Sequence, residues 1–506
     1  MGIIIRQSIK SSIATYFGTG IGVLSSIFIY PASAASLALY GTIQFIIDAA
    51  ALLANFGSMG VNALTIKFFP EFEDKERQNH GFLGILILLS ILGMLISGLL
   101  VFFLRAPLMQ FGAWLDISSD LFKTHTIGIL AITFCTIFIN LGINYTSNYK
   151  RIVVPKMIQD LGLKITLPIF ILAFTWQLLE ATQVEYLMVG VFFLILICIF
   201  LYLVYLGGLD WKANFSRINK GLAKRMGVFA AYGILSGVSG LLMLRIDSIM
   251  VATMISEEAN GIYKISSLII LTMAIPMNAI IKISDPIISR AWKDQNLKEI
   301  GELYRKSSTT LLVAGMFIFL GIWVSVEELF RLTGNFEAMI LGRYVILFIG
   351  LGKLFDLMSG INGSIIILSK YFRFHLITVM VLAVANIILN IILIPKYQIA
   401  GAALATMISL MLYNLVKFVF IWWKFKMQPF RFKVFKVLAL GALSAWIAFY
   451  IPSTNLLLLD ILINSLWICL SFFLPAIYFR FSEEISDFYF VTLKAIKLYL
   501  NRLFSK

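Results

Sequence analysis

Long uninterrupted apolar runs are the feature that most restricts how this chain can fold. About fourteen runs are long enough to cross a bilayer as helices, since roughly 20 apolar residues at about 1.5 Å each span the hydrocarbon core. A helix also satisfies its own backbone polar groups, as the bilayer requires. The predicted fold class is therefore an all-α polytopic membrane protein with about fourteen transmembrane helices. The predicted spans are residues 11–30, 39–65, 81–104, 124–147, 157–178, 187–207, 227–254, 263–288, 307–329, 341–368, 374–394, 401–422, 436–452 and 457–478.

Composition agrees with a membrane protein and argues against several other classes. Hydrophobic residues make up 60% of the 506 residues and charged residues 13%, about half the charged fraction of a typical soluble domain. The three cysteines and three histidines are scattered singly, so we expect no disulfide framework, no metal site and no cofactor. The sequence contains no Walker phosphate-binding motif, so ATP is not the expected energy source.

The uneven placement of lysine and arginine predicts the topology. When successive loops are assigned to alternate sides of the membrane, 30 of the 41 Lys and Arg residues fall on one side and 5 on the other, and 6 lie within or at the edges of spans. The positive-inside rule assigns the richer side to the cytoplasm, and an even number of spans places both termini there. The net charge of +15 then faces an anionic leaflet, so nucleic acid is not an expected partner. Residues 290–307 are predicted to form an amphipathic helix on that surface.

Weak internal similarity predicts two halves of the same orientation. Gly-Ile-Asn occurs at 142–144 and 360–362, an offset of 218 residues, and Gly-x-x-x-Gly motifs at 18–22 and 233–237 are offset by 215. Two parallel repeats around a central cleft are an architecture of secondary transporters. The predicted parts are an N-terminal six-helix lobe (1–210), a C-terminal six-helix lobe (211–423), an extra helix pair (424–480) and a cytoplasmic amphipathic tail (481–506).

One stretch resembles a known family. Residues 386–415, NIILNIILIPKYQIAGAALATMISLMLYNL, combine an asparagine-containing apolar helix, Ile-Pro-Lys-Tyr in a short outer turn, and Gly-Ala-Ala-x-Ala-Thr. The pattern resembles the polysaccharide transporter branch, with its Wzx-type oligosaccharide flippases, of the multidrug/oligosaccharidyl-lipid/polysaccharide (MOP) exporter superfamily. Residues 37–57 and 245–265 resemble the matching parts of the two lobes more diffusely. The glycine usual in the family's outer turn is Gln398 here.

The resemblance implies a MOP- or MATE-like fold and a function in transport. The implied activity is movement of an undecaprenyl-diphosphate-linked oligosaccharide, the repeat unit of an O-antigen, capsule or exopolysaccharide, across the bacterial inner membrane by alternating access. The implied partners are this lipid-linked oligosaccharide, membrane lipids, a polysaccharide polymerase and other assembly proteins. We expect a transporter and not an enzyme.

Two alternatives to a flippase stay open. A MATE-type, cation-coupled drug antiporter of the same superfamily would favour unpaired acidic residues in the cleft. A membrane-embedded polysaccharide polymerase or ligase would need a sizeable outer loop with acid–base residues, whereas the longest outer loop, 105–123, has about nineteen residues.

Charged residues inside the predicted spans mark the candidate site, because an ionised side chain at the centre of a membrane helix costs about 2.5–3.5 kcal/mol. Arg245 and Asp247 are two positions apart, a turn of about 200°, so each needs water or a partner from another helix. We expect Arg245 to face an aqueous cleft and meet the anionic diphosphate. The alternative is an interhelical ion pair between Arg245 and an aspartate, for which Asp48 is available.

The other candidate residues follow from local spacing and residue type. Lys353 and Asp356, and likewise Lys282 and Asp285, are three positions apart and can neutralise each other on one helix face. The predicted roles are diphosphate binding by Arg245, Lys353 and Lys282, ion coupling or pairing between the lobes by Asp48, Asp247 and Asp356, and sugar contacts by Asn144, Asn362 and Tyr40.

Overall fold

The protein is helical throughout the residues that the structure describes. The computed structural model describes residues 18–74, 78–114, 120–149, 151, 153–207, 212–454, 456–487 and 489–491. Within these residues there is no strand, and ten helices are long and apolar enough to cross a membrane, or up to eleven if the bent pair Glu257–Leu271 (α10) and Ala274–Lys293 (α11) is one span. The all-α, multi-pass class is confirmed.

The count of fourteen spans stays a prediction. Three features, in addition to the bent pair of α10 and α11, account for the smaller number of long helices. The expected spans 374–394 and 401–422 are the two arms of one element, Phe372–Phe425 (α17), which has 54 residues and a kink at Gln398 between the arms. Expected span 11–30 is represented by the short apolar helix Gly18–Phe28. Expected span 436–452 is represented by the 17-residue helix Phe432–Ala448 (α18).

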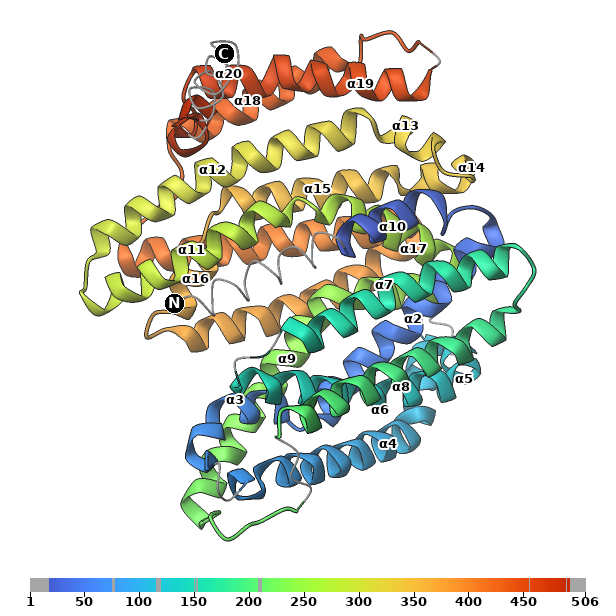
Figure 1. The fold of residues 1–506 in the computed structure, drawn as a ribbon. Coiled ribbons are helices and arrows are strands. Elements are labelled where there is room, and N and C mark those ends of the chain that lie inside the picture. Colours follow the sequence, from blue (N-terminus) through green and yellow to red (C-terminus); the bar gives the residue numbers. More distant parts are fainter. Residues whose placement is uncertain are drawn as a thin grey trace, which may run out of the picture. The chain divides into compact units, whose positions relative to one another are not determined.

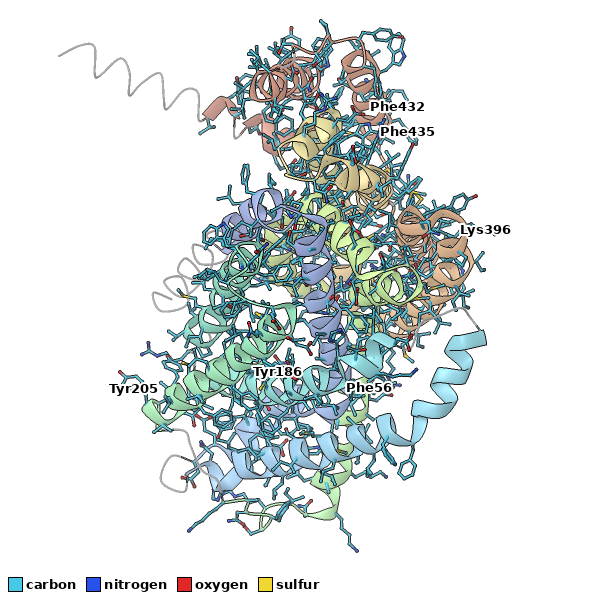
Figure 2. The ribbon with its side chains drawn as sticks, turned by 90° about the vertical axis from the view of Figure 1, so that its right-hand side faces the viewer. Phe56, Tyr186, Tyr205, Lys396, Phe432 and Phe435 are labelled. Atoms are coloured by element: carbon cyan, nitrogen blue, oxygen red, sulfur yellow. The ribbon has the colours of Figure 1, made fainter. Side chains whose placement is uncertain are left out.

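The outward-facing side chains fit a lipid environment. Helix α8 (Ala181–Tyr205) exposes Tyr186 near one end and Tyr205 at the other (Figure 2). Nineteen residues separate these tyrosines, about 28 Å of helix at roughly 1.5 Å per residue, close to the thickness of a hydrocarbon core. Tyrosines at this spacing are typical of the two membrane–water interfaces. Phe432 and Phe435 likewise expose their rings on α18.

The described helices form two compact units. The first unit comprises the described residues within 1–264 and 390–399. The second unit comprises the described residues within 265–389 and 400–506. The predicted boundaries at residues 210, 423 and 480 stay predictions. The tail predicted for 481–506 lies mostly outside the described residues.

The first unit is built around α2, which packs against α6 and α9 (Figure 1). Ser33 caps α2, and its capping box is closed by Ser36, whose backbone N–H donates to the Ser33 hydroxyl at 3.1 Å. Phe72 at the end of α3 stacks on Phe82 at the start of α4 with ring centroids 4.5 Å apart, and both are fully buried. Besides α8, the helices are α2 (Ala34–Gly57), α3 (Val61–Phe72), α4 (Phe82–Trp114), α5 (Asp120–Thr124), α6 (Thr126–Asn148), α7 (Val153–Thr175) and α9 (Lys220–Met254).

The second unit is built around α12, which packs against α11, α15 and α18. Tyr304, Ile365 and Ile421 are fully buried in one apolar cluster of this unit. Besides α11, α18 and the parts of α17 outside residues 390–399, its helices are α12 (Leu297–Val324), α13 (Val326–Arg331), α14 (Phe336–Met339), α15 (Arg343–Met358), α16 (Asn362–Ile367), α19 (Leu457–Ile468) and α20 (Leu474–Tyr478).

The expectation of a separate amphipathic helix over 290–307 is wrong. Residues 290–293 are the last turn of α11, and α12 begins at Leu297. Asn296 caps α12 by accepting a hydrogen bond from the Glu299 backbone N–H at 3.2 Å. Because Ile300 and Tyr304 are fully buried, the apolar spacing that suggested a surface helix instead belongs to the core face of α12.

Helix α17 breaks at the position where the sequence predicts an outer turn. Gln398 has φ 53° and ψ −136°, which are not helical angles. Pro395 lies three residues earlier and has no backbone N–H to donate. A positive φ favours glycine, so Gln398 holds a strained backbone conformation at the position where the family usually has glycine.

Candidate functional site

Two glycines bring α2 and α10 into backbone contact in the first unit. A Cβ atom added at Gly41 would overlap the carbonyl oxygen of Glu257, and one added at Gly261 would overlap the α2 backbone. The close approach allows the side-chain amide of Asn260 to donate to the Gly41 carbonyl oxygen at 2.8 Å. Lys264 lies four residues after Asn260 on the same face of α10, so it also faces α2.

Asp48 is a fully buried carboxylate that two cations share. Nη1 of Arg245 pairs with Oδ1 of Asp48, and Nζ of Lys264 pairs with Oδ2. A carboxylate among apolar helices is stable only when it is paired, so Asp48 ties α2 to α9 and α10. The ion pair considered as the alternative for Arg245 is therefore present. The Arg245 side chain remains 31% exposed, and its role in diphosphate binding stays a prediction.

Asp247 finds its partners on other helices, as its two-residue spacing from Arg245 requires. The hydroxyl of Tyr263 on α10 donates to Oδ2 of Asp247 at 3.2 Å. The side-chain amide of Asn390 on α17 donates to Oδ1 at 2.6 Å. Two neutral donors thus bind this buried carboxylate.

Lys353 and Asp356 begin a second polar cluster, which lies within the second unit. Nζ of Lys353 donates to Oδ2 of Asp356 at 2.8 Å, so the pair predicted from three-residue spacing on α15 is confirmed. The side-chain amide of Asn414 on α17 donates to the other carboxylate oxygen at 3.0 Å. Asp356 is buried, and both of its oxygens are hydrogen-bonded.

The cluster continues through Asn362 to a second lysine. The amide nitrogen of Asn362 donates to Oδ1 of Asn414 at 2.9 Å, and Nζ of Lys417 donates to Oδ1 of Asn362 at 3.2 Å. The Lys417 ammonium also lies 3.5 Å from the centroid of the Tyr413 ring, a cation–π contact. Lys417 is only 4% exposed. The lysine cluster, defined as Lys353, Asp356, Asn362, Asn414 and Lys417, therefore contains two ammonium groups and one carboxylate.

Sequence reasoning missed Lys264 and Lys417. Both belong to the six cations within or at the edges of the predicted spans, so a count of intramembrane charges marks them. No acidic residue stands three or four positions from Lys417, and its polar contacts are tertiary.

The remaining predicted residues make other contacts. Lys282 is exposed, and no ion pair joins it to Asp285 in the part of the chain that the structure describes. Asn144 donates to the side-chain oxygen of Asn62 at 3.0 Å. The ring of Tyr40 stacks on that of Tyr30 with centroids 4.1 Å apart. Their roles in binding the diphosphate or the sugars stay predictions. Among the described residues, His, Cys, Asp and Glu do not gather in a group that could hold a metal ion.

Solved structures share the fold of this chain. The chain is similar to the lipid II flippase MurJ in an inward closed conformation, with a TM-score of 0.70 and 17% identity over 93% of this chain and 99% of that one. It is also similar to an inward-facing multidrug resistance MATE family transporter of the MOP superfamily, with a TM-score of 0.58 and 14% identity over 84% and 98% of the two chains. At these identities the likeness shows the fold. It is the fold of MOP-superfamily transporters, as the sequence predicts.

The family follows from the sequence itself. The polysaccharide biosynthesis protein family matches residues 5–292, more than half of the chain, so the chain belongs to that family. A search of curated proteins finds no match. The fold is one that solved transporters have, which agrees with the prediction that the protein is not an enzyme. The protein is a multi-pass membrane protein of the polysaccharide biosynthesis family, with the fold of MOP-superfamily transporters.

Proposed function

We propose that this transporter is a flippase for an undecaprenyl-diphosphate-linked oligosaccharide in the bacterial inner membrane. Membership of a polysaccharide biosynthesis family and the fold shared with a lipid II flippase support a lipid-linked substrate. The oligosaccharide would be a repeat unit of an O-antigen, capsule or exopolysaccharide, received by a polymerase or another assembly protein. Both termini would lie in the cytoplasm. Transport would proceed by alternating access, driven by an ion gradient or by the membrane potential, worth about 2.3 kcal/mol per charge per 100 mV.

The observation that carries the proposal is the excess positive charge of the lysine cluster. Lys353 donates to the one carboxylate, Asp356, and Lys417 reaches it through Asn362 and Asn414, so the cluster has a net charge of +1 when both lysines are protonated. An uncompensated intramembrane charge is costly and marks function unless another ion balances it. A diphosphate is such an ion, and each of its oxygens accepts hydrogen bonds from ammonium groups. Lys353, whose side chain is 16% exposed, is the lysine that the diphosphate would reach.

Arg245 has a different environment and a different proposed role. Arg245 and Lys264 each pair with one oxygen of Asp48. With all three groups ionised, their net charge is also +1. The exposed part of the Arg245 guanidinium retains N–H groups directed away from Asp48, since a guanidinium carries five donors. We propose that Asp48 orients Arg245 for the diphosphate, and that Asp247 couples transport to an ion.

The cation antiporter is the weaker candidate because two of the three candidate aspartates, Asp48 and Asp356, already have cationic partners. Asp48 is shared by two cations and Asp356 by a lysine and an amide. A cationic drug would have to displace these partners. An anionic substrate would instead bind the positive charge of the lysines and the arginine that the aspartates leave uncompensated.

The test is transport of undecaprenyl-diphosphate oligosaccharide in proteoliposomes, together with restoration of surface polysaccharide in a flippase-deficient strain. We expect Lys353→Gln and Arg245→Gln to lower transport at least tenfold while the protein inserts normally. Lys298→Gln is the matched control, since it removes an exposed cation outside the lysine cluster and outside the predicted binding residues. Normal transport by both test variants, with loss only on substitution of Asp48, Asp247 or Asp356, would favour the antiporter. Hydrolysis or transfer of the substrate by the purified chain would favour the enzyme alternative.

A further inference from the structure

A pocket of about 400 Å³ opens beside the start of α9, and Asp48, Arg245 and Lys264 do not line it. Its size falls within the range of about 300–1,000 Å³ that ligand sites have. Helix α3 packs against α9 here, so both helices contribute to its wall. The lining residues are Glu71, Arg217, Asn219, Gly221, Leu222 and Arg225.

Positive charge predominates in the pocket, because two guanidinium groups face one carboxylate. Arg225 pairs with Oε1 of Glu71 and is 62% exposed. Arg217 donates to the backbone carbonyl oxygen of Glu71 at 3.4 Å, and in the described part of the chain no carboxylate lies within 4.0 Å of its guanidinium. Each guanidinium has five N–H donors in a planar fork that matches phosphate oxygens. Most of these donors are therefore left for a ligand.

The backbone adds to this preference for an anion. Asn219 caps α9 by accepting a hydrogen bond from the Leu222 backbone N–H at 2.8 Å, and its carbonyl accepts from the Ala223 N–H. The N–H groups of Lys220 and Gly221 precede the first intrahelical bonds and are left for a ligand. The helix dipole makes this end partly positive. Gly221 lines the pocket without a side chain, so the backbone stays accessible.

The position of the pocket favours a lipid as the source of the anion. It lies on the side that the distribution of Lys and Arg predicts to be cytoplasmic, where membranes present anionic headgroups. Phe215, two residues before Arg217, exposes 56% of its surface, as an aromatic side chain at a membrane interface does. Lys220 and Lys224 add further positive charge on the first turns of α9.

We propose that this pocket binds a phosphate group, supplied by the headgroup of an anionic membrane lipid and held by Arg217 and Arg225. Glu71 holds Arg225 in place and competes with the phosphate for it. Binding here does not depend on the identity of the transported molecule.

Site-resolved arginine modification tests the proposal on the full-length protein. The protein is placed in nanodiscs of phosphatidylcholine alone or of phosphatidylcholine with phosphatidylglycerol, and phenylglyoxal labelling is quantified by mass spectrometry. We expect phosphatidylglycerol to reduce labelling of Arg217 and Arg225 several-fold and to leave Arg290 unchanged. Arg290 is the reference because it is exposed, lies on the same predicted side and does not line the pocket. Equal protection of all three arginines, or of none, overturns the proposal.

A further experiment with soluble phosphate distinguishes a lipid headgroup from free phosphate as the source of the anion. Inorganic phosphate is added to the phosphatidylcholine nanodiscs at millimolar concentration. We expect less protection than phosphatidylglycerol gives, because soluble phosphate lacks the anchoring of the lipid in the bilayer. Protection equal to that by phosphatidylglycerol would reject the lipid as the source while retaining a phosphate site.

A matched pair of carboxylate variants tests the role of Glu71. Glu71→Gln removes the competitor of the phosphate, so we expect protection at a several-fold lower fraction of phosphatidylglycerol. Glu73→Gln makes the same change in net charge two residues away, outside the pocket lining, and should leave the titration unchanged. Identical titrations for the two variants would mean that only overall charge matters and would overturn the proposed site.

Discussion

Lys417 and Asp356 are connected through two asparagines rather than by direct contact. The Lys417 ammonium donates to Asn362, Asn362 donates to Asn414, and Asn414 donates to Asp356, with distances of 3.2, 2.9 and 3.0 Å. Every amide in this series has its oxygen toward the lysine and its nitrogen toward the carboxylate. The aligned dipoles therefore favour a charged lysine at one end and an ionised aspartate at the other.

Removing the second asparagine should destabilise the protein more than a surface substitution does. Asn414→Ala leaves the amide nitrogen of Asn362 and one oxygen of Asp356 without their partner, and each unsatisfied buried group costs about 1–3 kcal/mol. We expect a clear drop in the thermal unfolding midpoint in detergent and reduced transport. Asn144→Ala is the control, since its bond to Asn62 is only partly buried. Equal midpoints for the two variants would contradict the structural importance of the series.

The buried carboxylate shared by two cations predicts a large effect of neutralisation. Asp48→Asn would leave Arg245 and Lys264 facing each other without a counter-ion. Breaking a buried ion pair by removal of one partner costs about 3–5 kcal/mol. We therefore expect Asp48→Asn to lower the thermal midpoint strongly, and the second substitution Lys264→Met to recover part of the loss. A double variant no more stable than Asp48→Asn alone would show that charge balance is not the cause.

Much of this arrangement could be predicted from the sequence, because membrane helices produce local patterns of apolar and charged residues. Long apolar runs predict the helices, and the two-residue spacing of Arg245 and Asp247 predicts that they have separate partners. The spacing of Lys353 and Asp356 predicts their ion pair. These inferences need only helix geometry, which is the same for every chain.

The rest depends on tertiary contacts that local spacing does not contain. Lys282 and Asp285 have the same spacing as Lys353 and Asp356, yet no ion pair joins them within the described residues. Side-chain direction there depends on neighbouring helices. The contact of Lys264 with Asp48 joins residues more than 200 positions apart and depends on the close approach of α2 to α10 at Gly41. No periodicity in either helix indicates that approach.

Relief of backbone strain should stabilise the turn within α17. Gln398 has a φ of 53° and an exposed side chain, and non-glycine residues in such regions cost about 1–3 kcal/mol. Gln398→Gly removes this strain, while the added freedom of glycine in the unfolded chain offsets about 0.5–1 kcal/mol. We expect a net gain of about 1 kcal/mol in the free energy of unfolding. Gln398→Ala keeps the Cβ atom and should give no gain, so similar stabilisation by both variants would exclude strain as the cause.

The close approach of α2 to α10 predicts that Gly41 tolerates no side chain. The methyl group of Gly41→Ala would overlap the backbone carbonyl of Glu257, which cannot move aside as a flexible side chain would. Overpacking of this kind costs about 1–3 kcal/mol or more, and separating the helices would also weaken the bond from Asn260 and the ion pair of Lys264 with Asp48. We expect poor folding or a strongly lowered thermal midpoint.

Gly22→Ala is the matched control for Gly41→Ala. Gly22 is the second glycine of the first Gly-x-x-x-Gly motif, and an added Cβ atom there meets nothing within 4 Å, so the midpoint should stay the same or rise slightly, since alanine favours a helix over glycine. The two variants differ in position but not in chemistry, and both lie in apolar helices of the first unit. If they shift the thermal midpoint equally, the loss reflects helix flexibility in general and not the contact of α2 with α10. If only Gly41→Ala lowers the midpoint, the result supports the close contact of α2 with α10, which places Lys264 beside Asp48.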